Sequence, residues 1–298
     1  MIGSPFLAGR DRYERVMEGR VDNTHESAFT HTVRITDSDR SVEVAAVCSP
    51  SPTYQVQEAS GRVLAGVADP GIAADFPRLA GIRMVGGFTR QVAEVCGARE
   101  GAGLFVDAAI EVARLARQVA KMPASAVVTL RPGDAAACWA LDMAGWIDLP
   151  DSCFTYSPAA RALFATRPVS SPMVPALYSP APGARGVFTR KKLARLVLTG
   201  TRLHLFHSMH DNVHGFDLHY EVDLDRGVIA AAESITSRLP YAGICSEPQS
   251  RIESLRGQRI DAGLRKGIQT MLGGTGGCAQ LYDLTSDLLK LLSLPATD

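Results

Sequence analysis

The sequence predicts an α+β protein of two related units, each an antiparallel β-hairpin sheet packed by two helices, arranged about a pseudo-two-fold axis. The main observation is an internal repeat, because Leu79–Phe88 reads against Leu255–Leu264 and the alignment continues without a gap to Leu115 and Leu291. In both copies, strand-like alternation comes first and helical spacing follows. The repeat therefore predicts two similar halves facing each other.

The 298-residue chain is long enough for two ordinary domains. We expect a first unit at residues 1–168, a linker rich in Pro and Ser at 169–186, and a second unit at 187–298. The linker is indicated by five prolines between Pro168 and Gly186.

Each unit begins with a hairpin signal. Residues Phe29 to Val47 alternate in polarity around a turn at Asp37–Arg40, and in the second copy Leu218–Val222 leads through a turn at Asp223–Gly227 to Val228. Gly227 suits a turn position with positive φ. A stretch that contains proline follows each hairpin and ends strand pairing there.

A pair of helices closes each unit, with a glycine-rich elbow between them. Apolar residues recur at spacings of three and four, so each helix should bury one stripe against the hairpin sheet. The stripes are Met84, Phe88, Val92 and Val95 with Phe105, Ala108, Val112 and Leu115 in the first copy, and Ile260, Leu264, Ile268 and Met271 with Leu281, Leu284, Leu288 and Leu291 in the second.

The region between the copies is less regular. Ser125–Leu130 predicts a short strand, Pro132–Ala144 a helix ended by Gly145, and Ser157–Thr166 another helix. After the linker, Leu193–Phe206 alternates like a strand interrupted at Gly200.

Composition limits the classes of partner. The 46% hydrophobic and 21% charged residues are typical of a globular protein, and a formal net charge of zero gives no electrostatic basis for binding nucleic acid. The first ten residues lack the apolar core of a signal peptide, and no apolar run approaches the length that spans a membrane. We therefore expect a cytoplasmic protein with a small-molecule substrate; a homodimer is compatible with the sequence.

Three features of the second copy resemble a known family. These are His214 nine positions before Asp223, the Pro240-Tyr241 pair followed by Cys245, and an elbow in which Cys278 opens a helix. They resemble the bacterial domain of unknown function family 2889, here in two tandem copies. The family elbow reads Gly-Cys-Thr-His-Leu, and Gln280 stands where the family has histidine.

The resemblance extends to the first unit and to a functional setting. Leu149–Phe154 resembles the family's C-terminal Asp-x-Cys segment. By association only, the resemblance implies the breakdown of aromatic or acyl-thioester compounds.

Cys278 is the strongest single candidate for chemistry. A thiol at a helix N-terminus meets unpaired N–H groups and the positive end of the helix dipole, which favour the thiolate. The alternative is a small buried residue in a tight elbow, which Ala102 at the aligned position of the first copy supports. Six cysteines without a CxxC pair predict reduced thiols.

Five of the seven histidines lie between His204 and His219. In a helix, His204, His207, Asp211 and His214 would share one face and suit zinc, whereas strands would separate His204 from His207 across the sheet. A metal-dependent protein is therefore a third hypothesis.

Two further groups are candidate ligand contacts. Gly274, Gly276 and Gly277 form a loop that either cradles an anion on its amides or permits a tight elbow. Arg259, aligned with Arg83, either pairs with a ligand carboxylate or bridges the repeats. Cys245 is expected to approach Cys278 if the turn at Pro240 folds back over the elbow.

The sequence favours a cofactor-independent enzyme, a lyase, isomerase or hydrolase, for a small, partly apolar catabolic metabolite such as an aromatic compound. His214 is the expected general base, Tyr241 or Gln280 orients the substrate, and Cys278 lies beside them. The alternative is a ligand-binding or interaction module without turnover.

Overall fold

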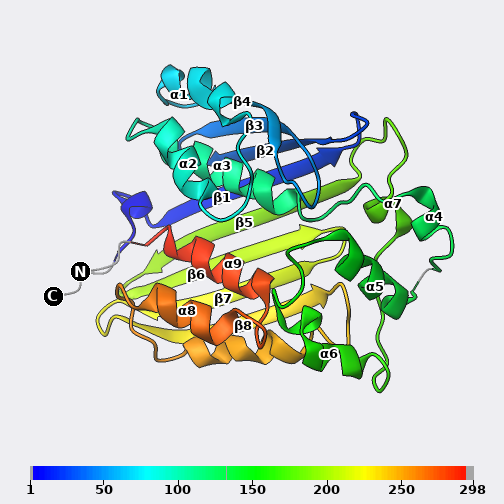
Figure 1. The fold of residues 1–298 in the computed structure, drawn as a ribbon. Coiled ribbons are helices and arrows are strands. Elements are labelled where there is room, and N and C mark those ends of the chain that lie inside the picture. Colours follow the sequence, from blue (N-terminus) through cyan, green and yellow to red (C-terminus); the bar gives the residue numbers. More distant parts are fainter. Residues whose placement is uncertain (1–2, 132, 293–298) are drawn as a thin grey trace.

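Eight strands form one antiparallel sheet (Figure 1). The computed structural model describes residues 3–131 and 133–292. The strands are β1 (Arg12–Asp22), β2 (Phe29–Asp37), β3 (Ser41–Cys48), β4 (Val56–Ala65), β5 (Phe188–Thr199), β6 (Arg202–Asp211), β7 (Gly215–Asp223) and β8 (Val228–Arg238). Their order in the sheet is β4-β3-β2-β1-β5-β6-β7-β8, so β1 and β5 join the two halves of the chain.

The α+β class is confirmed, and both expected hairpins are present as β2–β3 and β7–β8. Gly227 has a φ of 66° in the turn between β7 and β8. One hairpin in each unit was expected, but each half contributes four strands. β1 and β4 flank the first hairpin, and β5 and β6 precede the second. Strand β1 was not expected, because Arg12, Glu14, Glu18 and Arg20 place charges on its outer face. The alternation expected at Leu193–Phe206 is confirmed, since β5 and β6 lie on either side of Gly200.

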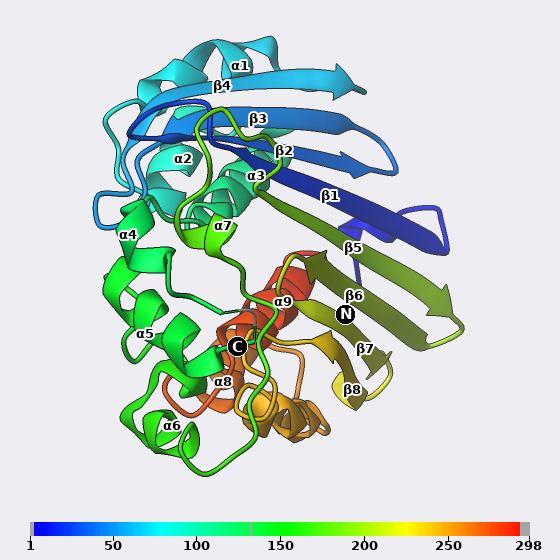
Figure 2. The ribbon, with the colours of Figure 1, turned by 90° about the vertical axis from the view of Figure 1, so that its right-hand side faces the viewer.

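The helices lie on one face of the sheet (Figure 2). They are η1 (Pro5–Leu7), α1 (Pro70–Asp75), η2 (Phe76–Leu79), α2 (Phe88–Cys96), α3 (Ala102–Leu115), α4 (Ala124–Val127), α5 (Ala135–Gly145), η3 (Phe154–Tyr156), α6 (Pro158–Leu163), α7 (Pro175–Tyr178), η4 (Glu247–Leu255), α8 (Leu264–Leu272) and α9 (Ala279–Leu289). Among the described residues, no helix combines the length and apolar character needed to cross a membrane.

The predicted helical stripes form the core. All of them are buried except Met271, which is half-buried. Helix α3 packs on β1, β2 and β3, and α9 packs on β6, while α2 and α8 pack against α3 and α9. Phe105 of α3 and Phe76 of η2 meet above β4, where Gly61 leaves room for them.

Buried charges connect the two halves beneath α3 and α9. Lys192 Nζ on β5 lies 2.7 Å from Glu111 Oε1 on α3 and 3.5 Å from Asp287 Oδ2 on α9, and Arg114 contacts both carboxylates at 2.5 Å. Burial acts to raise the pKa of Glu111, but the charges of Lys192 and Arg114 lower it to about 2. The carboxylate therefore stays ionised between the halves.

The aligned arginines do not bridge the repeats as expected. Arg83 donates to the carbonyls of Thr53 and Pro52, and Arg259 lies 3.9 Å from its neighbour Asp261. Both arginines belong to segments that pair with an outer strand. Residues 81–84 hydrogen-bond to residues 54–56 at the start of β4, and residues 257–260 hydrogen-bond along the free edge of β8.

The chain between the halves, residues 116–187, covers one end of the sheet and is called the cover segment below (Figures 1 and 2). The helices expected near 132–144 and 157–166 are α5 and α6; Pro132 itself lies outside the described residues. The strand expected at Ser125–Leu130 is wrong, because the short helix α4 forms there directly after Pro123. Val128 is exposed, so the short apolar run was misleading.

The stretch expected to act as a linker packs on both halves. Asn23 donates to the carbonyls of Pro180 and Ala181, while Ser170 pairs with Ala242. Helix α7 lies within it and Tyr178 is fully buried. The domain boundaries at 168 and 187 remain a prediction.

We predict that Lys192→Met lowers the free energy of unfolding by about 3 to 5 kcal/mol, because Glu111 and Asp287 lose a buried counter-charge. The matched control is Lys191→Met, whose side chain is exposed and lies 3.6 Å from Glu18. That change should cost less than about 1 kcal/mol. Urea denaturation at pH 7 measures both; equal losses would show that the buried network does not stabilise the junction.

Candidate functional site

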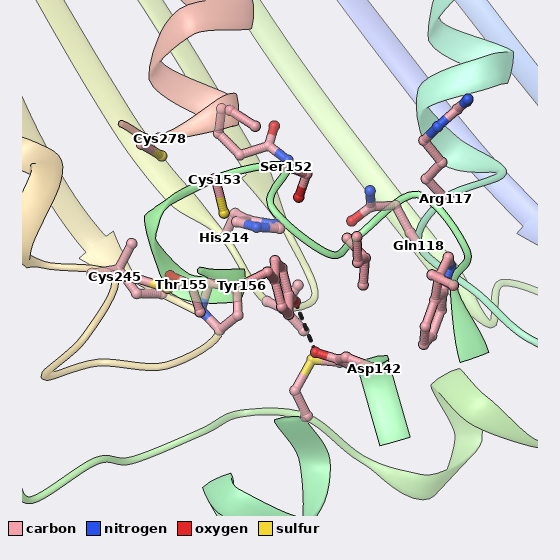
Figure 3. Close-up of a pocket in the computed structure, with 18 of the residues that line it drawn as sticks. Arg117, Gln118, Asp142, Ser152, Cys153, Thr155, Tyr156, His214, Cys245 and Cys278 are labelled. Atoms are coloured by element: carbon pink, nitrogen blue, oxygen red, sulfur yellow. Dashed lines mark hydrogen bonds between the residues drawn. The ribbon is translucent and has the colours of Figure 1, made fainter. Parts of the chain in front are cut away.

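A partly enclosed cavity of ≈ 130 Å³ lies between the cover segment and the second half (Figure 3). The second half contributes the turn after β6, the chain after β8 and the start of α9. The cover segment contributes residues from Arg117 to Leu177. The walls are mostly apolar, with a few polar groups that converge on the space, as in small-molecule sites.

Asp142 joins the cover segment to the second half. Its carboxylate accepts hydrogen bonds from Tyr156 and Tyr178, each at 2.8 Å, and from Tyr241, which follows β8. The side chain is 1% exposed, and this burial raises its pKa to about 6 although the three hydroxyl groups act to lower it. Three segments of the chain are thus fixed around one buried carboxyl group at the cavity wall.

His214 lines the cavity with a fixed orientation. Its Nδ1 lies 3.1 Å from both carboxylate oxygens of Asp211, which also accepts the backbone N–H groups of Val213 and His214. Arg190 reaches the same carboxylate at 2.7 Å. Burial acts to raise the pKa of Asp211, but the charges of His214 and Arg190 hold it well below its usual range. With Nδ1–H donating to Asp211, Nε2 is left as the basic nitrogen.

Three thiols gather at one side of the cavity: Cys153, Cys245 and Cys278 (Figure 3). Cys245 Sγ lies 2.9 Å from Thr155 Oγ1. Burial raises the pKa of Cys278 to about 11, and N–H groups of the helix start lower it only in part. The expectation of a thiolate at this helix start is therefore not supported by its environment, because loss of water outweighs the dipole.

The glycine-rich elbow between α8 and α9 is a tight turn. A Cβ on Gly277 would stand 2.1 Å from the carbonyl oxygen of Leu272, and Gly274 has a φ of 69°. The N–H groups of Gly277 and Cys278 are used within the elbow, by Gly274 and Leu272. These two elbow amides therefore serve the tight turn.

The candidate residues divide into two groups. His214, Cys245, Gly277, Cys278 and Gln280 line the cavity, and Tyr241 lies behind its wall on Asp142.

Gly274, Gly276 and Arg259 lie outside the cavity. Arg259 is exposed beside β8, so it cannot contact a ligand held there.

The histidine run forms strands β6 and β7, so the helical face needed for zinc does not form. His207 is buried under α9, where its Nδ1 lies 2.9 Å from the carbonyl oxygen of Leu284, whereas His204 is exposed on the opposite face. Within residues 3–131 and 133–292, no group of three or more His, Cys, Asp or Glu side chains has metal-binding geometry.

The first half has a turn of the same construction, but this turn contains no histidine. Asp37 Oδ1 accepts the backbone N–H groups of Asp39 and Arg40, as Asp211 does for the turn after β6. Arg40 is three residues after Asp37, just as His214 is three residues after Asp211. At the helix start, Ala102 is the first residue of α3, whereas Cys278 directly precedes α9.

No sequence pattern predicted a role for Asp142 or Trp146, and Cys153 belongs only to the segment Leu149–Phe154 that resembles the family's Asp-x-Cys segment. The one available signal was an acid in an otherwise apolar helix, since α5 reads Ala-Ala-Ala-Cys-Trp-Ala-Leu-Asp-Met-Ala-Gly. A buried acid of this kind is often functional or structural.

Comparison with known proteins gives one match. Residues 198–292 match the family model described as a protein of unknown function (DUF2889). The matched region contains His214, Tyr241, Cys245 and Cys278, and it does not include the first half of the chain. Neither the curated proteins nor the solved structures contain a match to the chain.

Asp142→Asn should change how stability depends on pH. Because the folded pKa is raised from 3.8 to about 6, the folded state binds this proton more tightly. This contribution, roughly 3 kcal/mol, is full below pH 3.8 and is lost as the pH rises to 6. Urea denaturation between pH 4 and 7 should show a shallower fall for Asp142→Asn than for wild type.

The matched control for that experiment is Asp134→Asn, at the exposed N-cap of the same helix, since Asn also caps helices. Its curve should run parallel to wild type. An Asp142→Asn curve that also runs parallel would refute the raised pKa.

Alkylation of Cys278 by iodoacetamide should rise about tenfold per pH unit between pH 7 and 9, because a thiol with a pKa of about 11 is protonated throughout this range. Peptide mass spectrometry measures the rate at this residue. A rate that levels off below pH 8 would instead indicate a thiolate in the folded protein.

Proposed function

We propose that the protein is a cofactor-independent enzyme, a lyase, isomerase or hydrolase, that acts on a small, partly apolar catabolic metabolite such as an aromatic compound. The observation that carries the proposal is the Asp211–His214 pair at the wall of a mostly apolar cavity. A histidine whose second nitrogen is held by a buried carboxylate is the usual arrangement of a general base.

In the proposed reaction, His214 Nε2 takes a proton from the substrate and Asp211 stabilises the resulting imidazolium. Arg190 holds Asp211 in place from β5. Gln280 lines the cavity and is suited to orient a polar group of the substrate. Tyr241 acts as a positioning residue, since its hydroxyl group is engaged with Asp142. Cys278 and Cys153 offer protonated thiols that can return a proton.

The size of the cavity limits the substrate. An engineered cavity of about 150 Å³ in another protein holds benzene, so ≈ 130 Å³ suits one ring or a branched chain of similar size. Larger metabolites would have to extend through the open side.

We also propose that the halves are tandem copies of the family's unit, of which the second keeps the site. The similar order of elements supports this history: four strands, a 3₁₀ helix and two helices recur in both halves, and the first half has α1 in addition. Arg40 and Ala102 would then mark the loss of the base and the thiol from the first copy.

The second candidate function is ligand binding without turnover. It is favoured by the three thiols, whose pKa values are raised by burial and which therefore lack the reactivity of a catalytic thiolate.

His214→Gln should abolish proton transfer while leaving the fold intact. We expect a loss of about 10²- to 10⁴-fold in the rate of deuterium exchange from D₂O into any responsive compound, screened by NMR over small aromatic ketones, oxo acids and thioesters. His210→Gln changes an exposed histidine on β6, shortly before the turn that holds His214, and should keep the full rate; His210 lies 3.1 Å from Asp217.

Two results would contradict the enzyme proposal. One is a responsive compound whose exchange survives His214→Gln in a protein with a normal circular dichroism spectrum and melting point. The other is a screen in which compounds bind in the cavity and none exchanges or turns over, which would favour the binding module.

A further inference from the structure

The two tryptophans of the chain differ in the partners of their indole N–H groups. Trp139 Nε1 donates to the carbonyl oxygen of Thr155 at 2.9 Å. Trp146 Nε1 is buried in a residue that is 3% exposed, and it has no hydrogen-bond partner among the described residues. An indole N–H can only donate, and a buried donor without an acceptor costs about 1 to 3 kcal/mol.

Trp146 lines the cavity, so its indole ring is among the groups that a bound ligand meets. The residue is held firmly, because it directly follows α5, its backbone N–H bonds to Asp142, and its ring packs edge-on against Tyr178 at 5.7 Å. The Trp146 indole is therefore held in place before a ligand binds, at the end of the helix α5 that carries Asp142.

Among the described lining residues, no lysine or arginine is free to pair with an anion. Arg117 is the one lysine or arginine among them, and each of its three nitrogens already donates a hydrogen bond. They bond to the carboxylate of Asp148 at 2.6 Å and to the carbonyl oxygens of Ala113 and Met84 at 2.8 and 2.7 Å. The guanidinium group also stacks over Tyr54.

The fixed charges near the cavity are negative or neutralised. Asp142 lines the wall, and Asp211 lies directly behind His214. An anionic ligand would lose its hydration in an apolar space, beside carboxyl groups and without a lysine or arginine to pair with it. A neutral ligand avoids this cost.

We infer that the cavity binds a neutral, ring-sized carbonyl compound whose oxygen accepts the Trp146 indole N–H, and that it rejects the carboxylate of the same shape. This inference rests on the proposed function in taking this cavity as the substrate site. It names the class of substrate: a small amide, ketone or aldehyde on an apolar ring.

Indole N–H signals of uniformly ¹⁵N-labelled protein test the inference, because two tryptophans give two signals and Trp139 serves as the internal control. The probes are benzamide, benzoate and toluene at pH 7.5. Benzamide should move the Trp146 signal downfield and leave Trp139 unchanged. Benzoate should bind at least tenfold more weakly, and toluene should bind without the downfield shift.

Assignment comes from Trp146→Phe, or from Trp139→Phe if the first variant does not fold. The inference is overturned if benzoate binds as tightly as benzamide, if benzamide binds without moving the Trp146 signal, or if none of the three binds. The wild-type protein separates this result from the enzyme proposal: a benzamide response together with no exchange or turnover in the compound screen would leave the ligand class standing and remove the catalytic role.

Discussion

The carboxyl group of Asp142 is the contact on which the candidate site depends. It gathers hydroxyl groups from η3, from α7 and from the chain after β8. Without it, three buried tyrosine hydroxyl groups would lose a shared acceptor at the cavity wall, although contacts such as Thr155 with Cys245 would still join the cover segment to the second half. Burying the Asp142 carboxyl group costs free energy, but its hydrogen bonds fix how three segments of the chain meet. A buried polar network of this kind specifies one arrangement of the segments that it joins.

Two buried aspartates of the site have opposite electrostatic settings. Asp211 is surrounded by an arginine, a histidine and backbone N–H groups, so its charge is stabilised and can support a cation on His214. Asp142 meets only neutral hydroxyl groups, and burial raises its pKa toward the physiological range. An aspartate side chain is thus stabilised in its charged form at Asp211, and burial favours its neutral form at Asp142.

The sequence predicted what local patterns determine. The helical stripes, both hairpins and the elbow at Cys278 follow from spacing and glycine placement, and they are found where expected. It did not predict the single shared sheet, since the pairing of β1 with β5 joins residues far apart in the chain. It singled out His214, Cys245 and Cys278 but not Asp142 and Trp146. These two lie in and directly after α5, a helix that the sequence predicts, and their burial depends on tertiary contacts.

The segments that carry the most regular part of the repeat lie along the outer strands. Residues 81–84 occupy hydrogen bonds at one end of β4, and residues 257–260 do the same on β8. An uncovered outer strand invites another chain to add to it, and a long antiparallel sheet would be a template for polymerisation. By pairing its own backbone with one end of each outer strand, at Val56 of β4 and at Val228 and Ile229 of β8, the protein shortens the edge that a strand of another molecule could join at both borders of the sheet.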